Sequence, residues 1–565
     1  MRTSMLYLVC LLIISCSNGA APRSHNSTGA MRQATETLSP EGLVELHTIV
    51  DGSRLAELQW QNFSDYAIWV KEFYATDPVQ LAWTSGGKPT KQALELIGIL
   101  EDAEQKGLES KDYDGERWPG RIGNLGVSHG EADLVNFDVA LTVSSMRYIS
   151  DLHLGRVDPK ILHRDFDPER HKYNLAEFLR QRVMTAASVE EALKGIEPPF
   201  PGYQRTIGAL QKYLQLAKEE TPDPLPTVKK PIEPGQNYEA LPKLAARLKF
   251  LGDLPVAANL APDSTAYQGD IVEAVKQFQQ RHGLESGGKL GPQTIEELNR
   301  PMSFRVRQLK LTLERWRWLP HEFEQPPILV NIPEFLLRAL DKEGKPTLLI
   351  RVVVGRAMRT ETPVLEEDMK YVVFWPYWNV PPSILRNELV PKIAKDPAYL
   401  EKNAFEVATY SGQVVTDGVV SEETLAQLRA GKLMVRQKPG PKNALGLIKF
   451  IFPNDNNVYL HSTPSTSLFA QSRRDFSHGC IRVEDPAALA EWVLRNNPGW
   501  TRERIDAAFN AQKEQQVNLT NVIPVLIVYG TAVVPEDGRA KFLEDIYGLD
   551  KKLEKLIAEA YAAKT

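Results

Sequence analysis

Two stretches decide how the C-terminal part of this chain folds: Val458-Tyr459-Leu460-His461-Ser462 and Ser477-His478-Gly479-Cys480-Ile481-Arg482. The first is rich in β-branched, aromatic and aliphatic residues, which predicts a strand that His461 closes. Cys480 follows His461 by nineteen residues. A loop of this length can return the chain beside its starting point, so we expect the thiol and the imidazole to lie close together.

Cys480 is the only thiol that the sequence places in the folded body of the protein. The sequence has three cysteines, and Cys10 and Cys16 lie in an N-terminal export segment. Structural cysteines of an exported protein usually form disulfide pairs, and Cys480 has no intramolecular partner left. A lone cysteine with histidines is a candidate nucleophile, and a buried structural cysteine is the alternative.

The residues around Cys480 indicate acyl transfer through a thioester. A thiol is a weak nucleophile at neutral pH unless a base or a cation helps to form its thiolate. His461 can take the thiol proton and later return it to a leaving amine. Gly479 lets the backbone approach a substrate closely, and the amides of Gly479 and Cys480 can point at a developing oxyanion.

A zinc site is the competing interpretation of the same residues. His461, His478 and Cys480 are all residue types that bind zinc. The spacing His478-x-Cys480 is unusual for a zinc site, however, and no fourth ligand is evident nearby in the sequence. The pattern therefore favours the nucleophile.

The N-terminus predicts export. Arg2 supplies a positive start, and Leu6 to Ile14 is an apolar stretch that is too short to span a bilayer. It leads into Ile13-Ile14-Ser15-Cys16, which resembles a bacterial lipobox with Cys16 as the lipidated residue. Ordinary signal cleavage near Gly19-Ala20-Ala21 is the alternative. Both interpretations predict an exported, periplasmic protein, and the first adds a lipid anchor at Cys16.

The length and charge of the chain set further limits. A chain of 565 residues is too long for one hydrophobic core, so several domains are expected. Hydrophobic residues make up 42% and charged residues 25%, which is typical of globular proteins. The net charge is −5, with no long basic run, so a nucleic-acid partner is not expected.

Hydrophobic periodicity divides the chain into segments of different structure. The pattern is mostly helical from about 41 to 220, for example over Lys91–Ala103, Val135–Leu154 and Asn174–Met184. Several prolines between Pro222 and Pro234 then predict a stiff linker. The predicted order is an export segment (1–20), a tether (21–40), a helical scaffold (41–220), a linker (221–237), a three-helix domain (238–300), a β-rich domain (304–535) and a C-terminal helix (538–565).

The three-helix domain carries the spacing of buried helical faces. Its first helix is expected to end at Gly252, and its second carries apolar residues at Ile271, Ala274, Val275 and Phe278. Three of its stretches resemble the peptidoglycan-binding domain of cell-wall enzymes: Leu251-Gly252-Asp253-Leu254, Ala274-Val275-Lys276-Gln277-Phe278-Gln279 and Gly291-Pro292-Gln293-Thr294. A role in packing alone is the alternative.

From about 304 the pattern changes to that of strands, which predicts a sandwich-like β domain. The strand-forming runs are Ile328–Ile332, Leu348–Val354, Tyr371–Phe374, Leu447–Phe452, Val458–Leu460 and Val522–Tyr529. The stretch from about 376 to 442 interrupts them with several prolines and short helical patterns. A connection of this size predicts a lid or a binding element.

Together these motifs resemble the L,D-transpeptidase (YkuD-type) catalytic domain. The resemblance rests first on His461 and on Ser477 to Arg482, and it covers roughly residues 60 to 535. It extends to Leu313-Glu314-Arg315-Trp316-Arg317-Trp318-Leu319-Pro320, to Trp375-Pro376-Tyr377-Trp378-Asn379-Val380-Pro381, to Val458-Tyr459-Leu460-His461-Ser462-Thr463-Pro464 and to the segment from Phe73-Tyr74 to Asp112-Tyr113. The implied fold class is multidomain α+β, with a helical N-terminal scaffold, a three-helix peptidoglycan-binding-like domain and a β-sandwich-like catalytic domain with an inserted lid.

The resemblance implies a role for each residue of the catalytic motif. Cys480 is the implied nucleophile, and His461 is the implied proton donor and acceptor, oriented by the backbone of Ser462. His478 is expected beside the site, and the amides of Gly479 and Cys480 are expected to form the oxyanion hole.

Substrate-binding residues are also implied. Arg482 is a candidate binder of a substrate carboxylate, and a structural ion pair is the alternative. Trp375, Tyr377 and Trp378 are candidates for stacking against the substrate at the base of the lid, and they are equally candidates for core aromatics.

The resemblance further implies the substrate. The donor is a tetrapeptide stem of peptidoglycan. Cys480 attacks the carbonyl of its third residue, a diaminopimelate, and the terminal D-alanine leaves. The amine of a neighbouring stem then resolves the thioester into a 3→3 cross-link. This chemistry requires no metal or cofactor. Family members are acylated by carbapenems, so Cys480 is their expected target, and other cell-wall synthesis enzymes are further candidate partners.

The sequence leaves alternative functions open. Water can resolve the thioester, which gives an L,D-carboxypeptidase or a cross-link hydrolase, and a further variant attaches proteins to the wall. These share Cys480 and His461 with the transpeptidase. A non-catalytic peptidoglycan-binding scaffold carried by residues 238 to 300 is the remaining alternative, and the intact pair of Cys480 and His461 argues against it.

Overall fold

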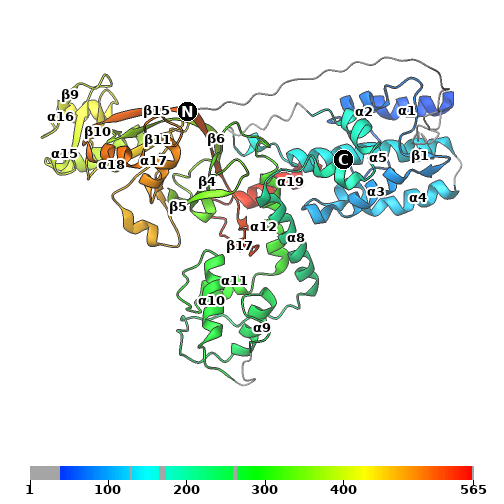
Figure 1. Cartoon of the computed structure of the whole chain (residues 1–565), viewed down its shortest axis with the longest axis horizontal. Coiled ribbons are helices and arrows are strands. Elements are labelled where there is room, and N and C mark those ends of the chain that lie inside the picture. Colours follow the sequence, from blue (N-terminus) through cyan, green and yellow to red (C-terminus); the bar gives the residue numbers. More distant parts are fainter. Residues whose placement is uncertain (1–37, 128–129, 164–172, 259–263, 563–565) are drawn as a thin grey trace, which may run out of the picture.

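The computed structural model describes residues 38–127, 130–163, 173–258 and 264–562. The predicted export segment with Cys10 and Cys16, and most of the tether, lie outside the described residues. Three lobes meet around α12 (Met302–Trp316) and α19 (Leu549–Ala562): a helical lobe on one side, a barrel with an insertion on the other, and a three-helix domain below them (Figure 1). Within the described ranges, no helix is long and apolar enough to cross a membrane.

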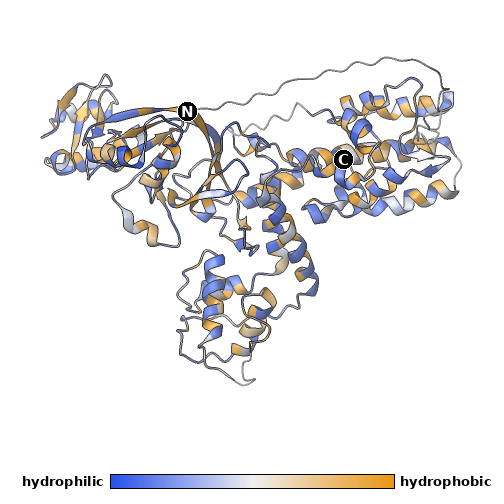
Figure 2. Cartoon of the chain, in the orientation of Figure 1, coloured by the Kyte–Doolittle hydropathy of each residue, from blue (hydrophilic) through white to orange (hydrophobic). Residues whose placement is uncertain are grey.

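The N-terminal lobe is helical, as predicted. Its helices are α1 (Pro40–Gly52), α2 (Ala67–Tyr74), α3 (Lys91–Glu101), α4 (Trp118–Val127), α5 (Glu131–Leu154), α6 (Leu175–Phe178) and α7 (Val189–Lys194). The next helix, α8 (Pro201–Glu219), lies outside the core of this lobe and packs against α12. The helices of the lobe carry apolar and polar residues on different sides (Figure 2), which lets each helix bury one face. α5 is buried over most of its length and forms the centre of the lobe.

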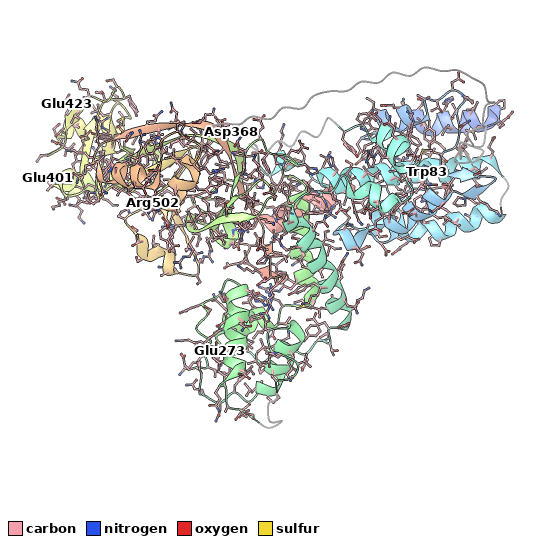
Figure 3. The ribbon with its side chains drawn as sticks, in the orientation of Figure 1. Trp83, Glu273, Asp368, Glu401, Glu423 and Arg502 are labelled. Carbon is pink, nitrogen blue, oxygen red and sulfur yellow. The ribbon has the colours of Figure 1, made fainter. Side chains whose placement is uncertain are left out.

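One buried carboxylate at the centre of this lobe is satisfied by hydrogen bonds. The carboxylate of Asp138 on α5 is fully buried. It accepts bonds from the amides of Ala82 and Trp83 and from the Tyr74 hydroxyl, as buried polar groups generally require. Trp83 lies among the helices of the lobe in Figure 3. This network fixes the loop before α3 against α5.

The three predicted helices of the second domain are α9 (Leu241–Leu251), α10 (Asp270–Arg281) and α11 (Pro292–Leu298). Gly252 follows α9 with φ of 78°, a left-handed conformation that ends a helix and favours glycine. Gly291 is the residue before α11. The predicted end of the first helix at Gly252 is therefore confirmed.

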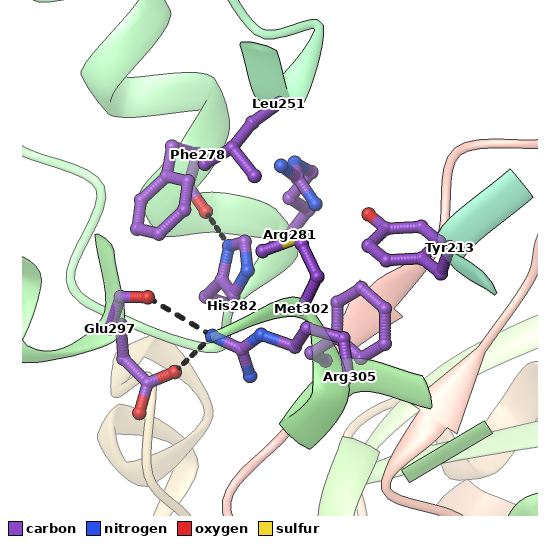
Figure 4. Close-up of a pocket in the computed structure, with 9 residues that line it drawn as sticks. Tyr213, Leu251, Phe278, Arg281, His282, Glu297, Met302 and Arg305 are labelled. Carbon is purple, nitrogen blue, oxygen red and sulfur yellow. Dashed lines mark hydrogen bonds and ion pairs between the residues drawn. The ribbon is translucent and has the colours of Figure 1, made fainter. Parts of the chain in front are cut away.

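A packed junction holds this domain against the rest of the chain (Figure 4). The His282 ring stacks on Phe278 with ring centroids 3.8 Å apart, and burial keeps the pKa of His282 well below its usual range. Arg305 of α12 (Met302–Trp316) pairs with Glu297 and lies over the ring of Phe542. The domain is thus fixed to segments that precede and follow the barrel in sequence.

The C-terminal lobe is a closed β-barrel. Its strands are β3 (Ile328–Asn331), β4 (Leu336–Leu340), β5 (Pro346–Gly355), β6 (Leu365–Phe374), β11 (Ile448–Ile451), β12 (Leu460–His461), β13 (Asp475–Ser477), β14 (Ile481–Val483) and β15 (Gln515–Val528). They follow the order β13-β5-β14-β12-β11-β6-β15-β3-β4, and β4 also pairs with β5. This pairing joins the sheet into a ring, so the prediction of a sandwich is wrong and a barrel replaces it.

The barrel core is filled by alternate residues of the strands and by two helices. Ile328 and Val330 of β3 are fully buried in it, because successive side chains of a strand point to opposite faces. α17 (Pro486–Leu494) and α18 (Arg502–Asn510) contribute Leu489 and Ile505 to the same core. Arg502 marks the start of α18 in Figure 3.

Two predicted boundaries of the barrel domain are wrong. Strands were expected from about 304, but residues 302–316 form α12, which packs its buried Leu309 and Leu313 between lobes. A helix was expected from 538, but Phe542 lies in β17 (Lys541–Phe542), paired with β16 (Ala532–Val533). The C-terminal helix α19 begins only at Leu549 and runs to Ala562.

α19 ties the barrel to the helical lobe. Tyr561 at its end donates a hydrogen bond to the buried carboxylate of Asp151 on α5. Near its start, Asp550 pairs with Arg315 of α12 at 2.5 Å. The segment after the barrel therefore reaches back across the molecule to the first lobe.

The predicted insertion folds as a unit, which we call the inserted subdomain (residues 376–447). It holds β7 (Trp378–Asn379), β8 (Phe405–Ala408), β9 (Val414–Thr416), β10 (Met434–Gln437), α13 (Pro382–Ile384), a π-helical turn (Leu385–Leu389), α14 (Val390–Lys395), α15 (Tyr399–Lys402) and α16 (Glu422–Arg429). Its strands are ordered β7-β10-β8-β9, over a core of its own. Glu401 and Glu423 mark it at the end of the molecule farthest from Trp83 in Figure 3.

Candidate active site

The pairing of β12 with β14 brings the two motifs together. These strands are parallel, with His461 opposite Arg482, and the Ile481 amide donates to the Tyr459 carbonyl oxygen at 3.0 Å. Side chains two residues apart on a strand point to the same face. Tyr459 and His461 therefore share a face of the sheet with Cys480 and Arg482.

His461 is buried and held in one tautomer. Its Nδ1 atom lies 2.5 Å from the carbonyl oxygen of Ser462. A carbonyl only accepts hydrogen bonds, so Nδ1 carries the proton and Nε2 is left as a base. Burial, aided by the positive charge of Arg482, lowers the pKa of His461 to about 3. The imidazole is therefore neutral at physiological pH.

Cys480 is partly exposed at the start of β14, with Sγ 3.7 Å from the carbonyl oxygen of Asn457. Burial raises the pKa of the thiol above its ordinary value, although hydrogen bonds with Tyr459 and the charge of Arg482 act in the opposite direction. The resting site thus holds a neutral thiol beside a neutral imidazole. Such a pair can react if the proton moves to the imidazole as the sulfur attacks.

The turn that presents Cys480 is held by its own side chains. Ser477 Oγ donates to the Cys480 carbonyl oxygen at 2.6 Å and accepts from the Gly479 amide at 3.1 Å. Gly479 adopts φ of 111°, a conformation that favours glycine. Since the Gly479 amide already has a partner, the Cys480 amide is the stronger of the two predicted oxyanion donors.

Arg482 places a positive charge beside the thiol and the imidazole. Its Nε atom is buried and has no hydrogen-bond partner among the residues that the structure describes. Burial lowers the pKa of the guanidinium, but arginine stays charged at physiological pH. This cation can therefore take an anionic group of a substrate.

The three predicted aromatics differ in position. Trp375 is buried in the barrel core and donates from Nε1 to the Phe509 carbonyl oxygen at 3.0 Å, which fits a core aromatic and not a residue that stacks on substrate. The guanidinium carbon of Arg436 lies over Tyr377, 4.4 Å from the centroid of the tyrosine ring. Trp378 of β7 acts on the hydroxyl of Tyr459, which in turn acts on the Cys480 thiol, so of the three aromatics it is the one that this network connects with the thiol.

His478 faces the inserted subdomain. Its side chain is exposed, and its Nε2 atom lies 2.7 Å from Glu388 Oε1 in the π-helical turn. Within the described residues, no group of three or more histidine, cysteine, aspartate or glutamate side chains is placed to hold a metal ion.

Three residues of the site were not assigned a role from the sequence. Tyr459 could have been found, because it lies two residues before His461 on the predicted strand and so shares its face. Glu388 and Thr362 come from distant segments, and no local pattern connects either of them with Cys480. Only the folded structure brings these two to the turn from Ser477 to Cys480.

Comparison with known protein families finds three matching regions in the chain. The model of the L,D-transpeptidase catalytic domain (YkuD) matches residues 326–523, that of a scaffold domain matches 68–210, and that of a "Putative peptidoglycan binding domain" matches 237–298. Parts of the chain are thus similar to an L,D-transpeptidase catalytic domain, to a scaffold domain and to a peptidoglycan-binding domain.

One curated relative and one solved structure are similar to parts of the chain. A "Putative L,D-transpeptidase" of Haemophilus influenzae is 33% identical over 248 residues, which is 44% of this chain and 49% of that protein. The chain thus spans about half the length of the curated relative it matches. The crystal structure of the L,D-transpeptidase (residues 123-326) from Xylanimonas cellulosilytica covers 54% of this chain and 100% of its own, with 14% identity and a TM-score of 0.18.

Proposed function

We propose that this protein is an L,D-transpeptidase that forms 3→3 cross-links in peptidoglycan through a thioester on Cys480. The observation that carries the proposal is the neutral His461, with its Nε2 atom left as a base, on the same face of the β12–β14 pair as the Cys480 thiol. The matches to the L,D-transpeptidase catalytic domain and to the peptidoglycan-binding domain support the substrate class.

The first half of the reaction forms the thioester. Sγ of Cys480 attacks the carbonyl carbon of the third residue of a tetrapeptide stem while Nε2 of His461 takes the thiol proton. The Cys480 amide stabilises the oxyanion that develops. When the carbon–nitrogen bond breaks, the imidazolium returns its proton to the nitrogen of the departing D-alanine.

The second half transfers the acyl group. The side-chain amine of a diaminopimelate on a neighbouring stem attacks the thioester, and Nε2 of His461 accepts a proton from that nitrogen. The carbon–sulfur bond breaks, the sulfur is reprotonated, and the new amide is the 3→3 cross-link. Arg482 is the proposed partner of a stem carboxylate, because a guanidinium matches its geometry.

The alternative proposal is hydrolysis at the same site. Water in place of the amine gives an L,D-carboxypeptidase or a cross-link hydrolase with the same first half-reaction. Attachment of a protein amine to the wall uses that half-reaction as well. The group that attacks the thioester therefore decides between these activities, and the experiment has to identify this group.

The test uses the purified full chain and a disaccharide-tetrapeptide, with products followed by mass spectrometry. Transpeptidation predicts a cross-linked dimer that has lost one alanine. A disaccharide-tripeptide monomer as the sole product overturns the proposal in favour of hydrolysis. Cys480→Ala and His461→Ala are expected to remove either product, and an active Cys480→Ala variant would show that the thioester mechanism is wrong.

We further propose that the protein is exported to the periplasm and anchored there by a lipid on Cys16. The apolar stretch from Leu6 and the sequence Ile13-Ile14-Ser15-Cys16 support this location. Cys16→Ser is expected to release the protein from membranes, and an unchanged membrane fraction overturns the anchor.

Carbapenems are the proposed inhibitors, and the expected adduct on Cys480 is measurable by intact-protein mass spectrometry.

A further inference from the structure

We infer that Thr362 is a positioning residue for the backbone amide of Cys480, and that the segment after the barrel keeps Thr362 in place through Tyr547. The inference rests on the proposed acyl transfer at Cys480 and adds to it residues from two segments outside the catalytic motif. It concerns the donor that receives the oxyanion, not the thiol itself.

Thr362 makes the direct contact with the catalytic turn. It lies in the loop between β5 and β6 and is only 2% exposed. Its Oγ1 atom donates to the Gly479 carbonyl oxygen at 2.7 Å and accepts from the Gly355 amide at 2.8 Å. A hydroxyl has one proton to donate. Because the Gly355 amide donates to Oγ1 and does not accept from it, the hydroxyl proton is available for the Gly479 carbonyl.

This contact determines which way the Cys480 amide points. The Gly479 carbonyl and the Cys480 N–H belong to one planar peptide group, and in a trans peptide they point in opposite directions. Thr362 holds the carbonyl on its own side, so the N–H points away from Thr362. Gly479 has no side chain to limit its backbone, and this hydrogen bond supplies the missing restraint.

A second anchor lies two residues earlier in the same turn. The Ser477 carbonyl oxygen accepts from the Arg356 amide at 3.0 Å and from Thr360 Oγ1 at 2.9 Å. The loop that carries Thr362 therefore holds the turn on both sides of His478. A Cβ atom added to Gly355 would lie 2.0 Å from the Thr360 carbonyl oxygen, so this loop is folded closely on itself.

Tyr547 braces Thr362 from the far side. Its hydroxyl donates to the Gly355 carbonyl oxygen at 2.5 Å and accepts from the Thr362 amide at 3.2 Å. Burial raises the pKa of Tyr547 to about 12, so the hydroxyl keeps its proton. The Tyr547 amide in turn donates to the Tyr529 hydroxyl at 2.9 Å, which fixes the backbone of this segment on the barrel.

The same segment continues into α19, which contacts the helical lobe. Tyr547 precedes α19 by two residues, and Tyr561 at the other end of the helix bonds to Asp151. A continuous set of hydrogen bonds and one helix therefore link the helical lobe with the peptide group of the nucleophile. This gives the segment after the barrel a part in the site.

The experiment compares two reactions of Cys480 in the full chain. Acetylation by p-nitrophenyl acetate passes through an oxyanion, whereas alkylation by iodoacetamide displaces iodide and forms none. Thr362→Val removes the hydroxyl with little change in shape, and we expect it to slow acetylation roughly 10- to 100-fold while alkylation is unchanged. Thr362→Ser is expected to restore acetylation, and Tyr547→Phe to slow acetylation alone.

Matched controls separate positioning from damage to the fold. Thr312→Val removes the hydroxyl of another buried threonine, which accepts from the Ala532 amide outside the site, and neither rate should change. Cys480→Ala supplies the background from other groups. If Thr362→Val slows both reactions equally, or neither, the inference is wrong. Because the probe is a simple ester, selective slowing upholds the inference even if no cross-link is formed from peptidoglycan.

Discussion

The Nε2 atom of His478 lies 2.7 Å from Oε1 of Glu388, and this hydrogen bond joins the catalytic turn to the inserted subdomain. The two side chains are 38% and 41% exposed, so water competes for both. Glu388 lies in a π-helical turn, a feature that occurs frequently at functional sites. A contact of this kind is weak enough to break and re-form as an element moves over a site.

The first prediction is that Glu388 limits access to the thiol. Glu388→Ala removes the contact with His478, and we expect fluorescein-5-maleimide, a bulky thiol reagent, to label Cys480 faster. Iodoacetamide is small, and its rate should not change. The free energy of unfolding should fall by less than about 1 kcal/mol, because a polar contact between two exposed side chains contributes little. Stopped-flow labelling measures both rates.

Glu422→Ala is the matched control, since Glu422 is an exposed carboxylate at the start of α16 in the same subdomain. It should leave both labelling rates unchanged. Equal maleimide rates in Glu388→Ala and the unmodified protein would show that the contact does not restrict the site.

The second prediction concerns the hydroxyl of Tyr459. This hydroxyl hydrogen-bonds to Cys480, and the bond acts to lower the pKa of the thiol. Tyr459→Phe removes it, so the pKa of Cys480 should rise above its already raised value. The rate of alkylation by iodoacetamide, followed against pH, should then increase at higher pH than in the unmodified protein.

Tyr410→Phe is the control for Tyr459→Phe. Tyr410 is exposed on the inserted subdomain, and its removal should leave the alkylation profile in place. A Tyr459→Phe profile that moves to lower pH would contradict the hydrogen bond to sulfur.

Local patterns predicted much of the fold. Gly252 marked the end of α9, because a left-handed backbone position favours glycine whatever surrounds it. Barrel closure was not predictable in this way, since it depends on the pairing of β4 with β5 as well as with β3. Phe542 falls within the segment expected to be helical from 538, whereas in the structure it pairs with Ala532 of β16 and lies under the guanidinium of Arg305.

The site likewise combines residues that local sequence patterns reveal with residues that only contacts between distant segments reveal. His461 and Cys480 are recognisable because their chemistry and spacing lie within one stretch of sequence. Thr362 is separated from Gly479 by 117 residues, and Glu388 from His478 by 90. A threonine in a loop and a glutamate in a helix have many ordinary roles, so only their contacts assign them to the site.

The third prediction is that His163 contributes to acid sensitivity. It is buried against Trp318, and burial with nearby cationic Arg315 lowers its pKa to about 3, below the unfolded value of about 6.5. Between these values the unfolded chain binds the extra proton, so stability falls as pH decreases from about 6.5 towards 3, by about 1.4 kcal/mol per pH unit. His163→Leu removes this group, and its Tm should fall less than that of the unmodified protein between pH 7.5 and pH 5.

His47 provides the control for this comparison, because its side chain is exposed on α1. His47→Leu should show the same fall in Tm as the unmodified protein. Differential scanning calorimetry at the two pH values measures the difference. An equal fall in Tm for His163→Leu would mean that other groups account for the acid sensitivity.

The fourth prediction is that Gly446 couples the inserted subdomain to the catalytic base. Gly446 lies where the chain returns to β11, with φ of 62°, and a Cβ atom added to it would lie 2.4 Å from Ser462 Oγ. The Ser462 carbonyl holds Nδ1 of His461, so Gly446→Ala should displace the group that fixes the base. We expect a loss of about 1–3 kcal/mol in stability and slower acetylation of Cys480 by p-nitrophenyl acetate.

Gly418→Ala, in the same subdomain with no atom within 4 Å of the added Cβ, should change neither quantity. If Gly446→Ala loses stability but acetylates Cys480 at the normal rate, then the return of the chain to β11 does not position His461, and the Ser462 carbonyl is held by β11 alone through the bond from the Ser462 amide to the Ile448 carbonyl oxygen.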